Sequence, residues 1–163
     1  MLTIRFDGGA TERYLAQLQA KLSNPEPLLK GIGEDLMHAT KERFKSGTAP
    51  DGSDWAPNSD VTKARYASKW SSRQAEKRKA QKKPLIGESK ALSRTINWQL
   101  KGRNAVAIGT PMIYGAVQQF GAPKAPRGRG PWGAIPARPY LGLSSADERH
   151  ILALVNRFIS GQN

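Results

Sequence analysis

The stretch IPARPYLGLS, residues 135–144, places two prolines, an arginine and a tyrosine directly before the last apolar segment of the chain. Pro136 and Pro139 fix their own φ angles and hold the residues before them in extended conformations. The stretch therefore predicts a stiff, extended segment that leads into a helix. Tyr140 can either enter the core of its own chain or dock on a neighbouring subunit, and Arg138 can reach an adjacent segment.

The segments on both sides of this stretch predict regular structure. Residues 144–160 carry apolar side chains at helical spacing and predict the C-terminal helix. Ser145 and Glu148 stand three residues apart at its start and predict a capping box. Two alternating segments on either side of residues 101–104 predict a β-hairpin. Residues 112–120 predict a short helix, which ends before a glycine.

The first third of the chain predicts one strand and two helices. Residues 2–6 alternate between apolar and polar side chains, as a strand does. Residues 11–23 predict a helix capped by Thr11, and a second helix follows residues 24–29 and ends at Gly47. A helix is also expected from near Ser89. The whole pattern predicts an α+β fold: a small antiparallel sheet of three or four strands packed against helices, with a long Pro/Gly-rich loop and a C-terminal helix.

Length and composition limit the classes of protein to consider. A chain of 163 residues favours one domain, residues 1–163, that buries roughly 70% of its unfolded surface. The sequence has no cysteine, which excludes disulfides and thiolate chemistry. It has no apolar run long enough to span a membrane and no apolar core of a signal peptide near its start. We therefore expect a protein that works in solution, without a membrane.

The net charge of +13 is concentrated in one segment. Residues 62–83 hold nine basic residues and one glutamate, with Tyr66 and Trp70 between them. This pattern indicates contact with a polyanion, either DNA or an acidic protein surface, although a solvated basic helix also fits it. We favour a helix with frayed ends. The basic side chains are Lys63, Arg65, Lys69, Arg73, Lys77, Arg78, Lys79, Lys82 and Lys83.

Two loops are expected to have roles of their own. Residues 47–59 are rich in turn-forming residues, and Trp55 is their single large apolar side chain, so we expect it to anchor this loop to the core. Asp51 and Asp54 are better explained by turn chemistry than by a calcium site. Residues 121–136 are too rich in proline and glycine for regular structure, and a loop of this length usually has a function.

The sequence predicts no catalytic, cofactor-binding or metal-binding residue. Its two histidines, His38 and His150, each fall in a predicted helix without a recognisable catalytic partner. With no cysteine and two histidines the chain has too few ligands for a zinc site, and the glycines at 31, 33 and 128–130 do not form a phosphate-binding motif. We therefore expect no enzyme activity and no cofactor.

Four motifs follow one another along the chain: RFKSGTAPDGSDWAP (43–57), PLIGESKALSRTI (84–96), VAIGTPMIYGAVQQFG (106–121) and IPARPYLGLSSAD (135–147). In this order they resemble the bacteriophage virion morphogenesis family, which includes the Mu-like G proteins and the tail-completion S proteins. The resemblance covers roughly residues 35–160. Gly115 and Gln118 depart from it, because the family often has alanine and histidine there. The basic segment and the KAPRGRGPWG loop are elaborations to which no family role carries over.

The resemblance implies a structural protein of the phage neck or tail end, assembled in the host cytoplasm. Such proteins form homo-oligomeric rings, which we expect here to be hexamers, as tail terminators, tail-completion proteins or head–tail joining proteins. Partners would be the tail tube, connector proteins and, non-specifically, packaged DNA. The expected contacts with a neighbouring subunit or the ring lumen are Phe120, Lys124, Arg127, Arg129, Trp132, Arg138 and Tyr140. The alternative is a non-specific nucleic-acid-binding protein that uses the basic 62–83 segment.

Overall fold

The computed structural model describes residues 9–69, 74, 77, 82–124 and 134–161. Within these residues the fold is α+β: six helices and a two-stranded antiparallel sheet. Its elements, in chain order, are α1 (Gly9–Ser23), α2 (Glu26–Ser46), α3 (Asp60–Ala67), α5 (Ala91–Arg94), β1 (Asn97–Lys101), β2 (Ala105–Gly109), α6 (Gly115–Phe120) and α7 (Ser145–Ser160).

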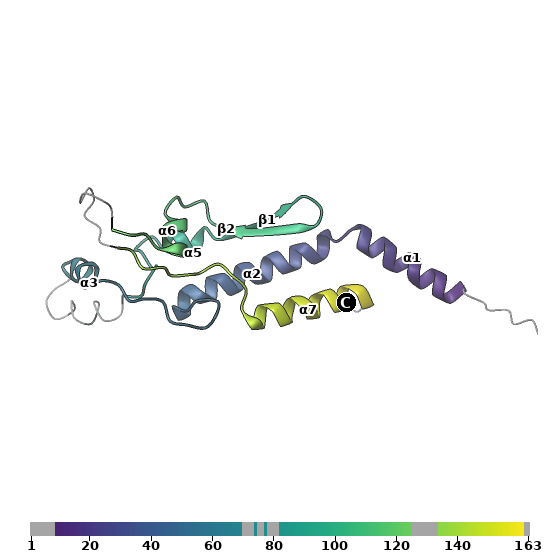
Figure 1. The fold of residues 1–163 in the computed structure, drawn as a ribbon, viewed down its shortest axis with the longest axis horizontal. Helices are drawn as coiled ribbons and strands as arrows, with labels where there is room; N and C mark the ends of the chain where they lie inside the picture. Colours follow the sequence, from purple (N-terminus) through teal and green to yellow (C-terminus); the bar gives the residue numbers. More distant parts are fainter. Residues whose placement is uncertain (1–8, 70–73, 75–76, 78–81, 125–133, 162–163) are drawn as a thin grey trace, which may run out of the picture.

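Helix α2 is the longest element and runs through the middle of the molecule (Figure 1). The hairpin β1–β2 lies along one side of it and α7 along the other, while α1 extends beyond the body. The helix begins at Glu26, earlier than the sequence predicted, because Pro27 is tolerated in a first helical turn. It ends as predicted at Gly47, whose φ of 88° suits a residue without a side chain.

The sheet of the described residues is smaller than the three or four strands predicted. The hairpin is confirmed, with Trp98 opposite Ile108 and Leu100 opposite Val106. No further strand joins it among the described residues, and the predicted strand at residues 2–6 lies outside them. The hairpin packs on α2, which agrees with the expectation that helices cover the sheet.

The hairpin meets α2 at a glycine. An ideal Cβ on Gly33 would lie 2.6 Å from Cδ2 of Trp98, closer than real Cβ contacts come. Gly31 stands two residues before Gly33 in the same helix, and nothing lies within 4 Å of an ideal Cβ there. The two glycines therefore differ in role: Gly33 admits the indole ring, whereas Gly31 only weakens the helix.

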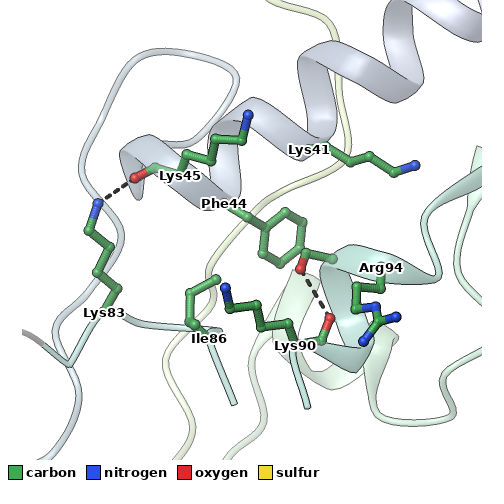
Figure 2. A pocket seen from close by; sticks show the side chains of 8 residues that line it. Lys41, Phe44, Lys45, Lys83, Ile86, Lys90 and Arg94 are labelled. Carbon is green, nitrogen blue, oxygen red and sulfur yellow. Dashed lines mark hydrogen bonds between the residues drawn. The ribbon is translucent and has the colours of Figure 1, made fainter. Parts of the chain in front are cut away.

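The core lies at the C-terminal end of α2. Phe44, Trp55 and Tyr140 pack their rings together, with centroids 5.3 Å apart for Phe44–Trp55 and 5.4 Å for Phe44–Tyr140. Leu92 and Ile96 complete the cluster with Ala49. Phe44 also lines a cavity between α2 and the segment that contains α5 (Figure 2).

Two sequence predictions of local structure need correction, and a third is confirmed in part. The capping box of α7 is formed by Ser144 and Asp147, one residue earlier than predicted, because Asp147 is held in place by a contact from α2. Thr11 lies inside α1 and does not cap it. The helix expected in the basic segment is confirmed in part: α3 covers Asp60–Ala67 and is capped by Ser59, whose Oγ accepts from the N–H of Thr62, and the described residues Gln74 and Lys77 are also helical.

The glycine contact gives a matched pair of substitutions. Gly33→Ala forces the Trp98 ring away from α2 and should destabilise the protein by about 1–2 kcal/mol, in spite of the better helix propensity of alanine. Gly31→Ala gains that propensity without a clash and should stabilise by up to about 1 kcal/mol. Urea unfolding of both variants checks this, and equal effects from the two substitutions would contradict the role given to Gly33.

Candidate functional site

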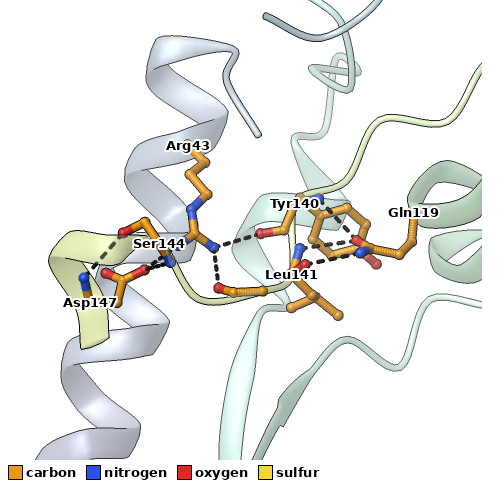
Figure 3. A network of polar contacts seen from close by, with 7 residues as sticks. Arg43, Gln119, Tyr140, Leu141, Ser144 and Asp147 are labelled. Atoms are coloured by element: carbon orange, nitrogen blue, oxygen red, sulfur yellow. Dashed lines mark hydrogen bonds and ion pairs between the residues drawn. The ribbon is translucent and has the colours of Figure 1, made fainter. Parts of the chain in front are cut away.

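The 135–144 segment is held on one side by Gln119 of α6 (Figure 3). The Oε1 atom of Gln119 accepts from the backbone N–H of Tyr140 at 2.9 Å and of Leu141 at 3.0 Å. Its Nε2 donates to the carbonyl of Leu141 at 3.0 Å. One side chain thus pairs three backbone groups of a segment that has no strand partner there.

Arg43 of α2 holds the same segment from the other side (Figure 3). Its Nη1 donates to the carbonyls of Tyr140 at 3.1 Å and Gly142 at 2.8 Å, and its Nη2 donates to the carboxylate of Asp147. Asp147 also accepts from the N–H of Ser144 at 2.8 Å as part of the α7 cap. The guanidinium is buried, and one carboxylate and two carbonyl dipoles balance its charge.

Arg138 and Pro139 of the segment are fixed against the turn-rich loop. Trp55 donates from its indole Nε1 to the carbonyl of Pro139 at 2.7 Å. Arg138 donates to the carbonyls of Ala56 at 2.7 Å and Pro57 at 2.9 Å. Burial lowers the pKa of Arg138, but an arginine remains charged at any physiological pH. These contacts lock the segment and the loop into one unit.

The structure divides the predicted interface residues into three groups. Arg138 is 7% exposed and Tyr140 1% exposed, so both lie inside the chain and, contrary to the prediction, present no surface to a neighbour. Burial raises the pKa of Tyr140. Phe120 is 79% exposed, and Lys124 is also exposed. The remaining three, Arg127, Arg129 and Trp132, lie outside the described residues.

Part of the predicted basic segment is engaged within the chain. Lys69 forms an ion pair with Glu88, and its hydrogen bond lowers the pKa of that carboxyl. Lys82 lies 4.4 Å from the centre of the Tyr66 ring, and partial burial lowers the pKa of its ammonium group. Lys83 donates to the carbonyl of Lys45.

The other members of that segment make fewer contacts or are outside the description. Lys63 approaches Asp60 at 3.4 Å, and Arg65 and Lys77 are exposed. Arg73, Arg78 and Lys79 lie outside the described residues. Lys69, Lys82 and Lys83 therefore contribute contacts within the chain.

The acidic and histidine side chains occupy ordinary structural positions. Asp51 accepts from the N–H and the hydroxyl of Ser53, and these bonds lower the pKa of Asp51, as expected for a turn. His150 lies 2.9 Å from the Asp35 carboxylate, which joins α7 to α2, and His38 is exposed. Among the described residues no three His, Cys, Asp or Glu side chains gather as they would around a metal ion.

The sequence reading missed Arg43, Gln119 and Asp147 as the residues that hold the segment. A signal existed for Arg43, because it interrupts the apolar stripe of α2 between Thr40 and Phe44, both of which are buried. Gln119 and Asp147 stand in the quoted motifs, but the backbone groups that they bind are not visible in a sequence.

The contacts around residues 135–144 are those of a structural clamp: they satisfy backbone groups and fix two loops. The chain matches the phage virion morphogenesis family over residues 7–160 and belongs to it. It is 38% identical to capsid assembly protein G of Escherichia phage Mu over 61 residues, which are 36% of each chain. No solved structure matches the chain.

Membership of this family makes the protein a structural component of the phage virion, in a family that is generally non-enzymatic. In the described part of the chain, none of the helices has the length and apolar character needed to cross a membrane.

Arg43 provides the test of the clamp. Arg43→Met removes three hydrogen bonds and leaves Asp147 without its cation, which should destabilise the protein by about 3 kcal/mol in urea unfolding. Lys45→Met is the matched control in the same helix, because Lys45 forms an exposed pair with Glu42. It should change stability by less than about 0.5 kcal/mol. A similar small change for both variants would contradict the clamp.

Proposed function

We propose that this chain is a ring-forming subunit at the tail end or neck of the virion, as a tail terminator, tail-completion or head–tail joining protein. Its family membership and the similarity to a capsid assembly protein support a role in assembly. No bond-making step is part of the proposed role, and it requires no cofactor. The neighbours in the virion would be the tail tube and connector proteins.

The observation that carries this proposal is the exposed apolar surface of α1 and α7. Neither helix has a buried residue. Tyr14, Leu15 and Leu22 of α1 are each more than half exposed, and Leu152 of α7 is 62% exposed. A helical face of this kind normally packs against another surface.

Helix α1 in particular needs a partner. It has 15 residues, about the length at which an isolated helix is only marginally stable in water. It extends away from the body (Figure 1). Lys21 near its C-terminal end donates a hydrogen bond to the carbonyl of Ile159 in α7. Covering a half-exposed leucine contributes about 1 kcal/mol, so several such residues favour association. A second copy of the chain would supply the missing surface, and repeating that contact around an axis closes a ring.

The alternative, a free nucleic-acid-binding protein, has less support from the structure. The described lysines at 69, 82 and 83 are engaged with other groups of the chain. Non-specific contact with packaged DNA remains compatible with a ring in the neck.

Oligomerisation is tested on α1. Leu15→Glu places a charge in the apolar face and should shift purified protein from an oligomer, which we expect to be a hexamer, towards monomers in native mass spectrometry. Ala20→Glu introduces the same charge on the opposite face of the helix and should leave the oligomer intact. A wild-type protein that is monomeric at every concentration, both alone and in virion extracts, would overturn the proposed ring.

The position in the virion is tested by deletion of the gene from the phage. Electron microscopy should show overlong tails if the protein terminates the tube, or normal tails detached from heads if it joins tail to head. Complementation with the unmodified gene is the control. Normal, attached tails in the deletion strain would contradict both roles.

A further inference from the structure

The cavity between α2 and residues 83–94 has a composition that the assembly role does not explain. Its volume is about 600 Å³, and its apolar lining is the half-buried Ile86 together with the 2% of Phe44 that stays exposed. Five cationic side chains surround this apolar part, and no acidic side chain lines the cavity (Figure 2). The five are Lys41, Lys45, Lys83, Lys90 and Arg94.

Three of these cations have no counter-charge in the described part of the chain. Lys45 pairs with Glu42, and Lys83 donates to a backbone carbonyl. Lys41, Lys90 and Arg94 form no ion pair with any described acidic residue. A concave surface lined by one sign of charge strengthens the field inside it and attracts the opposite charge.

The wall of the cavity is also unusual in its backbone. Leu85 and Lys90 have φ angles of 58° and 52°, and they are the two described non-glycine residues with positive φ. The left-handed region costs a non-glycine residue roughly 1–2 kcal/mol. Both residues belong to the short segment that carries Ile86 and Lys90 into the cavity. Backbone strain of this kind is frequent at ligand-binding sites.

We propose that this cavity binds an acidic segment of a partner protein that carries an apolar side chain between carboxylates. The apolar side chain packs on Ile86 and on the exposed edge of Phe44, and the carboxylates pair with Lys41, Lys90 and Arg94. Figure 2 shows these cations distributed around the Phe44 ring, so carboxylates on either side of one apolar residue meet a positive charge. This inference goes beyond the ring role and does not depend on it.

The charge and shape of the site favour such a partner over two other occupants. A second copy of this chain has a net charge of +13 and is therefore repelled by a cationic cavity. A DNA duplex is too wide to enter a cavity of this volume, and its phosphates leave the apolar surface uncovered. An acidic, partly apolar peptide satisfies both features.

The test measures peptide binding by fluorescence anisotropy with the full chain. The probe is a fluorescein-labelled peptide, Asp-Glu-Phe-Asp-Leu-Glu-Glu, at about 0.15 M salt. A second probe replaces Phe and Leu by Ser at the same charge. We expect saturable binding of the first peptide and about tenfold weaker binding of the second.

Matched variants locate the binding. Lys90→Glu with Arg94→Glu should weaken binding of the first peptide about tenfold or more. Lys101→Glu with Arg103→Glu makes the same change of charge at the hairpin turn and should alter binding by less than about twofold. Thermal unfolding checks that both variants fold, and Lys90→Gln with Arg94→Gln replaces the first variant if it does not.

Four outcomes overturn the proposal. The first is an equal loss of peptide binding in the cavity variant and the hairpin variant. The second is equal affinity of the wild-type chain for the two peptides. Either result would mean that net charge alone accounts for the binding. The third is that a short duplex DNA displaces the peptide and that the cavity substitutions weaken DNA binding as much as peptide binding. This result would identify the cavity as a nucleic-acid site. The fourth is absence of saturable binding of the first peptide by the folded wild-type chain, and a changed native mass of the cavity variant would then identify a second copy as the occupant. The Leu15→Glu variant tests the ring separately from this site, because it leaves the cavity unchanged.

Discussion

The position of α7 relative to α2 depends on a buried guanidinium. Arg43 binds two carbonyls of the extended segment and the carboxylate that caps α7, so one side chain fixes the end of the segment and the start of the helix together. Removing such a charge from water is costly, and only complete pairing offsets that cost. The arrangement is therefore sensitive to the path of the backbone at Tyr140 and Gly142, and the stiffness of Pro136 and Pro139 limits the paths available.

Polar contacts are important for the stability of this fold because the apolar core is small. Its fully buried cluster has six residues, concentrated at one end of α2. The other end is covered by the hairpin and part of α7, and α1 continues beyond them. A chain of this size usually closes its apolar faces within itself. Here the faces of α1 and α7 stay partly open, which is the expected condition of a subunit that completes its packing by assembly.

Features set by local chemistry could be predicted from the sequence, and features set by distant partners could not. Gly47, Gly121 and the hairpin follow from turn and helix-end chemistry within a few residues. The capping box was placed one residue late because Ser145 with Glu148 and Ser144 with Asp147 fit the local pattern equally well. Only the ion pair with Arg43, more than a hundred residues away, distinguishes them. Similarly, the burial of Arg138 depends on the carbonyls of Ala56 and Pro57, which spacing along the chain does not reveal.

The charge of the chain adds a constraint to assembly. Copies with a net charge of +13 repel one another, and this repulsion opposes the apolar attraction of α1 and α7. Ion pairs within the chain do not reduce it, because the 13 acidic residues are already counted in the net charge. A polyanionic neighbour lowers the repulsion between copies, whether it is DNA in a channel or an acidic protein segment. An acidic segment in the cavity at Phe44 neutralises charge at a fixed point on each subunit, and so would make ring closure more favourable in the presence of the partner than in its absence.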